Sequence, residues 1–176
     1  MQEMKIIDPE KIPSSDLPLI VLSAHDTDST SWLIRWFTNS SYNHIMWMNR
    51  KGFLASQGLL FGEVPIEKYM KKGCRLKFWA IKDFTATKKR LACSLIKQRL
   101  DLPWYKRRYD FLGIIGQSIN IRWINNPWTT YCSEQMASDL LKIVSHIPGK
   151  PSPEELNKLF KTRPDEFEYC GHWFFD

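Results

Sequence analysis

A cysteine that opens a helical stretch is the residue in this sequence best placed to do chemistry. Cys132 stands in the run Tyr131-Cys132-Ser133-Glu134, and residues 135–144 then place apolar side chains at the spacing of one helix face. Unpaired backbone N–H groups and the helix dipole favour an anion in the first turn of a helix. A thiol there has a lower pKa than the usual value of about 8.5, which makes it a nucleophile. We therefore interpret Cys132 as a candidate nucleophile, the alternative being a cysteine that packs under its helix.

A histidine far upstream is a candidate base for this thiol. His44 begins an apolar run that ends at Met48, and residues 49–52 separate it from a second run at 53–57, so the pattern predicts a β-hairpin. A thiol nucleophile needs an imidazole within hydrogen-bond reach and a third group that orients the imidazole. Such a pair is assembled in space, so the sequence separation of His44 and Cys132 is no objection. The alternative is a structural histidine.

The elements that would position these two residues are a mixture of strands and helices. Besides the hairpin, we predict strands at 17–23 and 75–82, and helices at 30–37, 65–70, 87–100 and from Cys132 to 144. A further helix is predicted to start at Ser152-Pro153-Glu154-Glu155, because this run combines a capping box with proline at the first helical position. The order of the elements indicates an α+β fold in which a small, mainly antiparallel sheet packs against helices, with the candidate nucleophile at a helix N-terminus.

Length and composition limit the class of protein. With 176 residues, of which 43% are hydrophobic, we expect one domain over 1–176, with an N-terminal lead at 1–16 and an aromatic C-terminal tail at 165–176. Four cysteines without regular spacing do not indicate a disulfide framework. The sequence shows no signal peptide and no apolar run of about 20 residues, so we expect a cytoplasmic protein without a transmembrane span.

The net charge of +6 raises the question of a nucleic-acid partner. The basic clusters are short, scattered and mixed with acidic residues, so they are more typical of solvated surfaces, and we expect no nucleic acid to bind. Peripheral contact with an anionic lipid or cell-wall surface would suit the same charge. We expect no cofactor and no metal, because the run from Cys170 to His172 is too short for a zinc site.

Five short motifs occur in a recognisable order. They are Leu19-Ile20-Val21-Leu22, Tyr42-Asn43-His44-Ile45, Tyr109-Asp110, Tyr131-Cys132-Ser133-Glu134 and Ser152-Pro153-Glu154-Glu155-Leu156. This set resembles the circularly permuted branch of the NlpC-type papain-like amidases, the YiiX-like group, which is related in architecture to the lecithin retinol acyltransferase-like enzymes. The resemblance implies a permuted papain-like fold, in which the catalytic His44 precedes the catalytic Cys132. It also implies that Tyr109 helps to position the site.

In the family the residue that orients the catalytic histidine is usually an acid, an amide or a histidine, whereas residues 53–58 of this chain contain no acid and no histidine. If the two strands meet directly across the turn 49–52, then His44 lies opposite Gln57, whose side-chain carbonyl would hold the imidazole. A slip of one residue in the register would select Ser56 instead. Glu63 is a more distant acidic candidate.

The chemistry that these residues suggest is thiol acyl transfer. His44 would activate Cys132 for attack on a carbonyl, and the backbone N–H of Cys132 together with Tyr131 would stabilise the oxyanion. We therefore expect a cysteine-dependent amidase or acyl hydrolase that acts on peptide, isopeptide or lipid amide and ester bonds, for example in cell-wall peptides. The alternative is a weak or inactive member of the family that serves as a structural or interaction protein, for example in a virion.

Overall fold

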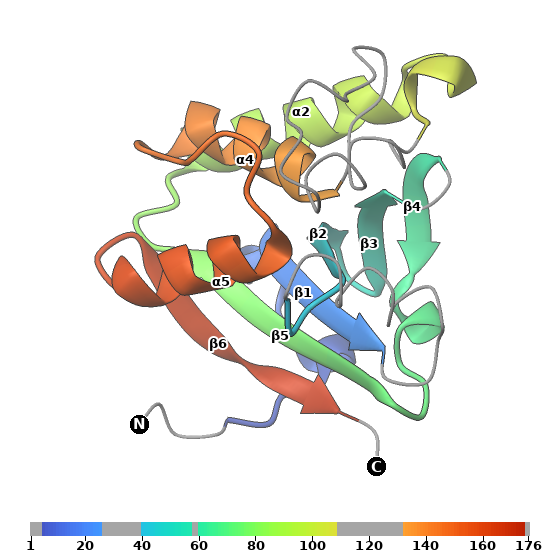
Figure 1. Ribbon diagram of the computed structural model, residues 1–176, viewed down its shortest axis with the longest axis vertical. Coiled ribbons are helices and arrows are strands. Elements are labelled where there is room, and N and C mark those ends of the chain that lie inside the picture. The colour runs from blue at the N-terminus through green and yellow to red at the C-terminus, as the bar shows by residue number, and fades with distance from the viewer. Residues whose placement is uncertain (1–4, 26–39, 58–59, 109–131, 175–176) are drawn as a thin grey trace.

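The computed structural model describes residues 5–25, 40–57, 60–108 and 132–174. Within these residues a six-stranded sheet forms the centre of the molecule, and every neighbouring pair of strands is antiparallel (Figure 1). The strand order is β4-β3-β2-β1-β5-β6. The strands are β1 (Leu19–His25), β2 (His44–Arg50), β3 (Phe53–Gln57), β4 (Phe61–Pro65), β5 (Cys74–Ile81) and β6 (Phe167–Phe174). The predicted α+β class with an antiparallel sheet packed against helices is confirmed.

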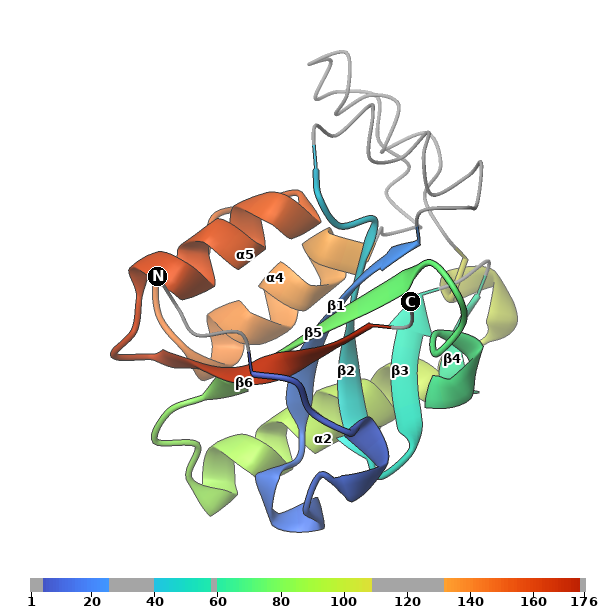
Figure 2. The same ribbon diagram turned by 90° about the horizontal axis from the view of Figure 1, so that it is seen from below.

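Helices α2 (Ala86–Leu100), α4 (Cys132–Ile143) and α5 (Pro153–Thr162) pack on one face of this sheet (Figure 2). Their apolar sides form a first core with strand residues such as Trp47 and Trp79. The predicted apolar face of α4 is confirmed, because Met136, Leu140, Ile143 and Val144 are all buried. Burial of this face accounts for most of the stability of such a helix.

Two predicted helix starts can be compared directly with the structure. The capping box at Ser152 is present, with Ser152 Oγ accepting from Glu155 N at 3.2 Å and Glu155 accepting from Ser152 N at 2.6 Å. The start of α2 was predicted at Thr87, but the cap is Thr85, whose hydroxyl accepts a hydrogen bond from Lys88 N. Both threonines lie within three residues of the basic run Lys88-Lys89-Arg90, so the sequence alone does not separate them.

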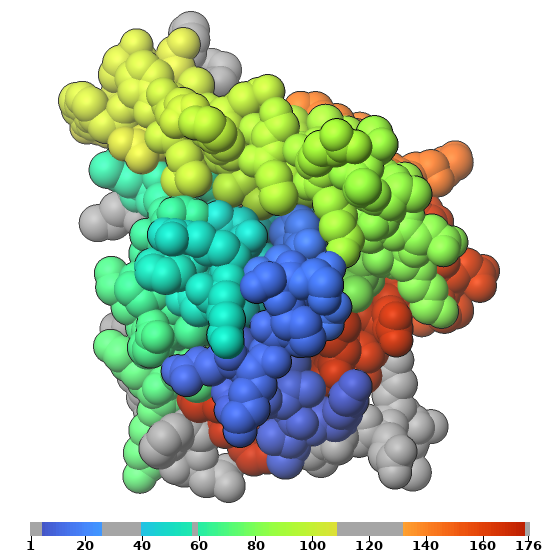
Figure 3. Space-filling model, turned by 180° about the vertical axis from the view of Figure 1, so that it is seen from behind, coloured from blue at the N-terminus to red at the C-terminus, as the bar shows by residue number. Residues whose placement is uncertain are grey.

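The opposite face of the sheet carries a second core, over which the N-terminal segment lies. In Figure 3 the blue atoms of this segment lie between the β2–β3 hairpin and β6. Ile12 and Leu17 pack there against inward side chains of β1, β2, β3 and β5. The segment also joins the sheet, since Ile7 N donates to His172 O at 2.9 Å and His172 N donates to Lys5 O at 2.8 Å. The predicted N-terminal lead is therefore a structural layer of the domain.

The predicted aromatic C-terminal tail is part of the sheet in the described residues. Residues 167–174 form strand β6, which pairs along its length with β5. Glycine, glutamate and mixed aromatic residues weaken the alternating pattern there, so the sequence did not indicate a strand. A bulge between Phe78 and Trp79 also shifts the register of the pair.

None of the helices in the part of the chain that the structure describes is long and apolar enough to span a membrane.

Candidate active site

The imidazole of His44 is held in a buried chain of hydroxyl groups. His44 is the first residue of β2, and 8% of its surface is exposed. Its Nε2 lies 2.8 Å from Ser56 Oγ on the neighbouring strand β3. Ser56 Oγ lies in turn 2.7 Å from the hydroxyl of Tyr69, and the Tyr69 ring stacks on the imidazole with centroids 6.2 Å apart. One nitrogen of the imidazole is therefore oriented by a polar partner.

The register of the β2–β3 hairpin explains why this partner is Ser56. The direct pairing across the turn would have placed His44 opposite Gln57. The structure instead pairs Trp47 with Ala55 and shifts the register between Trp47 and Arg50. That shift turns Ser56 to the face of His44 and turns Gln57 to the other face, because successive side chains of a strand alternate.

Gln57 is therefore a wrong assignment for the orienting residue. Its Nε2 donates to the backbone carbonyl of Arg107 at 2.8 Å, which ties β3 to the segment after α2. Glu63 is also engaged elsewhere: it forms an ion pair of 3.0 Å with Arg50 and accepts a hydrogen bond from Asn49. Of the three candidates, Ser56 alone contacts the imidazole. Ser56 was one of the alternatives considered from the sequence. The register shift that brings it to His44 leaves no signal in the hydrophobic pattern.

Tyr69 was not anticipated from the sequence. It follows the short 3-10 helix Ile66–Lys68, which the sequence predicted only as part of a helix at 65–70. Ile66 N donates to Gly52 O at 2.9 Å, so this helix is fixed against the hairpin turn. A tyrosine 25 residues after the histidine gives no periodic signal, and its place beside Ser56 follows from the tertiary fold.

Cys132 occupies the first position of α4, as the sequence predicted. The side chain is buried, with 5% of the residue exposed, and it belongs to the core on the helix side of the sheet. His44 shares its face of β2 with Met46 and Met48, which belong to the core on the other side. The thiol and the imidazole thus belong to opposite sides of the sheet, and a contact between them requires that they meet at the end of β2, around its first residue.

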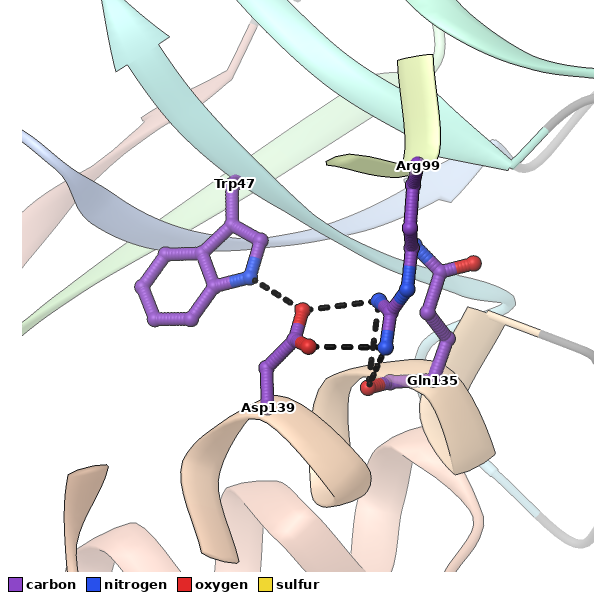
Figure 4. A network of polar contacts seen from close by, with 4 residues as sticks. All are labelled: Trp47, Arg99, Gln135 and Asp139. Atoms are coloured by element: carbon purple, nitrogen blue, oxygen red, sulfur yellow. Dashed lines mark hydrogen bonds and ion pairs between the residues drawn. The ribbon is translucent and has the colours of Figure 1, made fainter. Parts of the chain in front are cut away.

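Helix α4 is fixed against β2 and α2 by a buried polar network (Figure 4). Asp139 has no exposed surface, and its Oδ2 accepts from Trp47 Nε1 at 3.1 Å and from Arg99 Nη1 at 2.8 Å. Arg99 Nη2 pairs with Asp139 Oδ1 at 2.7 Å, and the guanidinium also reaches the Gln135 carbonyl at 3.5 Å. Three elements are thus joined through one carboxylate.

This network aligns the start of α4 with the start of β2. Trp47 follows His44 by three residues, which span about 10 Å in a strand. Asp139 follows Cys132 by seven residues, which span about 10.5 Å in a helix. Seen from below, α4 and β2 begin beside one another (Figure 2). The fold therefore brings Cys132 and His44 to the same end of the α4–β2 pair, and their direct contact stays a prediction.

The electrostatics of the site favour neutral groups. Burial lowers the pKa of His44 to about 4, so its imidazole is neutral at pH 7 and able to accept a proton. Burial also raises the pKa of Tyr69, and the nearby Cys132 adds to this rise, while the hydrogen bond from Ser56 opposes it. The influence of Cys132 on Tyr69 places the thiol within electrostatic range of the hydroxyl chain that holds His44.

Two further predicted site residues cannot be placed relative to His44 and Cys132. Tyr109 and Tyr131 lie outside the residues that the structure describes. Within the described residues, no group of three or more His, Cys, Asp or Glu side chains could hold a metal ion. The four cysteines are present as thiols.

Comparison with protein-family models and with curated proteins gives no match for this chain.

Proposed function

We propose that this protein is a cysteine-dependent amidase or acyl hydrolase of the permuted NlpC-type papain-like class, with Cys132 as nucleophile and His44 as base. The observation that carries the proposal is the fixed imidazole: Ser56 Oγ lies 2.8 Å from His44 Nε2, which leaves Nδ1 as the nitrogen for a thiol. The supporting observation is the start of α4 at Cys132, aligned with the start of β2 by the Asp139 network.

The proposed reaction has two halves. In the first, His44 Nδ1 takes the proton of Cys132 Sγ while sulfur bonds to the substrate carbonyl carbon, whose oxygen gains the negative charge. The C–N or C–O bond then breaks, and His44 returns the proton to the leaving amine or alcohol. In the second half, water attacks the thioester, His44 takes the proton of the water, and the acid leaves as Sγ regains a proton. Throughout, Nε2–H donates to Ser56 Oγ.

The backbone N–H of Cys132 is the proposed donor to the oxyanion. It belongs to the first turn of α4, where N–H groups have no partner within the helix. Tyr131 is the proposed second donor, and Tyr109 a positioning residue, as the family resemblance implies. The proposed substrates are peptide, isopeptide or lipid amides and esters.

A structural or interaction role is the second candidate function, and two observations favour it. His44 and Cys132 are both buried and belong to opposite sides of the sheet. The partner of His44 is also an uncharged hydroxyl, which stabilises an imidazolium less than a carboxylate would.

Acyl transfer to the protein itself separates the two candidates. The full chain is incubated with small thioester and activated-amide acyl donors, and the acylated cysteine is identified by peptide mass spectrometry. We expect the acyl group on Cys132, and we expect its formation to fall at least a hundredfold in His44→Ala. The exposed Cys93 on α2 is the internal control. Acylation of Cys93 without Cys132, or equal acylation of Cys132 in His44→Ala, would overturn the proposal.

A further inference from the structure

A cavity of about 810 Å³ lies between α5 and the β5–β6 pair, outside the hydroxyl chain of His44. Three cationic side chains line it: Arg75 and Lys77 from β5, and Lys161 from α5. Among the described residues that line it, none is acidic. Its volume is within the range of about 300–1,000 Å³ that is typical of cavities for small ligands. The cavity therefore combines a suitable size with an excess of positive charge.

Of the three cations, Lys77 has its ammonium group held between two aromatic rings. Its Nζ lies 4.8 Å from the centre of the Trp79 ring and 5.2 Å from the centre of the Tyr169 ring, so two aromatic faces hold the ammonium group. Burial and the neighbouring Lys161 lower the pKa of Lys77 to about 8, while Glu154 opposes that shift. Burying a cation beside another cation costs stability, and an anion in the cavity would offset the cost.

Aromatic side chains form the remaining walls. The hydroxyl of Tyr169 is hydrogen-bonded to His172 Nδ1, and the His172 ring lies 5.6 Å from the ring of Phe174. Tyr42, which precedes β2, also lines the cavity. Such flat, partly polar walls suit the backbone and side chains of a peptide, and cationic groups beside them suit a carboxylate.

The cavity lies two strands away from the strand position of His44. Lys77 and His172 lie on the side of the sheet that the helices cover, which is also the side of Cys132. Tyr42 precedes His44 by two residues. Leu76 of the cavity pairs with Ser23, which pairs with His44, so two strand spacings of about 4.8 Å separate the two positions. About three residues of extended peptide would cover that distance.

We propose that this cavity binds a carboxylate of the peptide substrate, about three residues from the bond that Cys132 cleaves, an inference whose link to hydrolysis rests on the proposed function. The carboxylate belongs either to an acidic side chain or to a peptide C-terminus. Both sources present the same planar anion to Arg75, Lys77 and Lys161.

Direct binding to the full chain with Cys132→Ala tests the proposal without any need for turnover. Three fluorescent six-residue peptides are compared by anisotropy: one with a single glutamate and an amidated C-terminus, one with glutamine instead, and one with glutamine and a free C-terminus. We expect the glutamine amide to bind at least tenfold more weakly than one of the two carboxylate peptides. Which carboxylate peptide binds identifies the source of the anion.

Matched variants assign that binding to the cavity. Lys77→Gln and Lys161→Gln are each expected to weaken binding of the carboxylate peptide about tenfold. Lys158→Gln, an exposed position on the same helix outside the cavity, is expected to leave the affinity unchanged. Lys161 is itself exposed, so its replacement keeps the test valid if Lys77→Gln does not fold.

Three results would overturn the proposal: equal affinity for all three peptides, an equal effect of Lys158→Gln and Lys161→Gln, or full displacement of the peptide by an equal concentration of inorganic phosphate. Failure of this inference differs from failure of the proposed function. An inert Cys132 in a chain that binds the carboxylate peptide refutes the hydrolase alone, whereas an acylated Cys132 in a chain that binds none of the peptides refutes the cavity alone.

Discussion

Ser56 defines the chemistry that His44 can perform. In the proposed tautomer the Ser56 hydroxyl accepts the Nε2–H of a neutral imidazole and fixes the ring, but it adds no negative charge. The neutral ring is favoured further by burial, which lowers the pKa of His44 to about 4. We therefore expect His44 to act as a general base on a neutral thiol, rather than as an imidazolium that keeps Cys132 ionised at rest.

Replacement of Ser56 by alanine should slow the reaction of Cys132 with iodoacetamide at pH 7 by about tenfold or more. The variant leaves a buried imidazole nitrogen without its hydrogen bond, at a cost of about 1–3 kcal/mol. Labelling is measured by peptide mass spectrometry, and circular dichroism verifies the fold. Gln57→Ala is the matched control on the next residue, because the Gln57 amide binds the Arg107 carbonyl. Equal rates in the two variants would exclude Ser56 as the orienting residue.

The depressed pKa of His44 also predicts how stability depends on pH. In the unfolded chain His44 binds a proton near pH 6.5, but in the fold it does so only near pH 4. The unfolded state therefore binds more protons between these two values, so the free energy of unfolding falls as the pH drops from about 6.5 to 4. The contribution is at most roughly 3 kcal/mol.

Urea unfolding at pH 7.0, 5.5 and 4.5 measures this contribution. In His44→Gln the loss of stability below pH 6.5 should be smaller than in the native sequence by most of that amount. His146→Asn, at an exposed position, is the control and should retain the native slope. The same slope in His44→Gln and the native sequence would show that His44 is not buried in its neutral form.

At the level of the elements, the packing of α4 against β2 and α2 determines whether the Cys132 thiol and the His44 imidazole can meet. Helix α4 carries Cys132 and β2 carries His44, and Asp139 binds Trp47 and Arg99 from the two neighbouring elements. A buried ion pair adds little net stability compared with apolar packing, but it does specify one arrangement of its partners. We infer that this carboxylate fixes the position of α4 along β2.

Asp139→Asn should lower the free energy of unfolding by about 3 kcal/mol, because it leaves Arg99 without its charged partner in a mostly buried site. Asparagine keeps the size and the acceptor for Trp47, so the change isolates the charge. Chemical denaturation measures the loss. Asp101→Asn, which breaks the exposed Lys97–Asp101 pair on α2, should cost at most about 0.5 kcal/mol. A cost of Asp139→Asn below 1 kcal/mol would contradict a role for this ion pair.

Elements with a local signal were predictable from the sequence, and contacts that depend on register were not. The hairpin after His44 follows from two apolar runs around a turn, and α4 follows from its 3.6-residue period. The choice of Ser56 over Gln57 depends on a register shift near the turn. Tyr69 and Arg99 reach the site from elements distant in sequence, and no periodic pattern encodes such a meeting.

At the scale of the whole molecule, the sheet separates two cores. The helices cover one core, and the N-terminal segment covers the other (Figures 1 and 3). The α+β class followed from the sequence of predicted elements, whereas the roles of the two chain ends did not. Residues 5–7 and β6 lie together at one edge of the sheet, and their pairing is a long-range contact that local propensity does not show.

Gly171 makes that edge possible, and its replacement by alanine should destabilise the domain by about 2 kcal/mol or more. Its φ of +145° disfavours any other residue, and a Cβ would lie 2.6 Å from Ile7 Cγ2 and 2.7 Å from Lys5 O. Limited proteolysis should then cut within residues 5–12, and urea unfolding gives the loss of stability. Gly62→Ala, where a Cβ meets open space, is the control. Equal stability of the two variants would contradict the proposed role of this edge.

The pH dependence of iodoacetamide labelling at Cys132 decides whether this thiol is a nucleophile that His44 activates. Cys93 provides an exposed thiol for comparison, Cys74 provides a buried one, and burial raises the pKa of Cys170 to about 11. We predict that Cys132 is alkylated faster than Cys93 between pH 6 and 8, and that His44→Ala removes this advantage without unfolding the protein. Labelling of Cys93 while Cys132 stays unmodified up to pH 8.5, or an unchanged rate at Cys132 in His44→Ala, would contradict it.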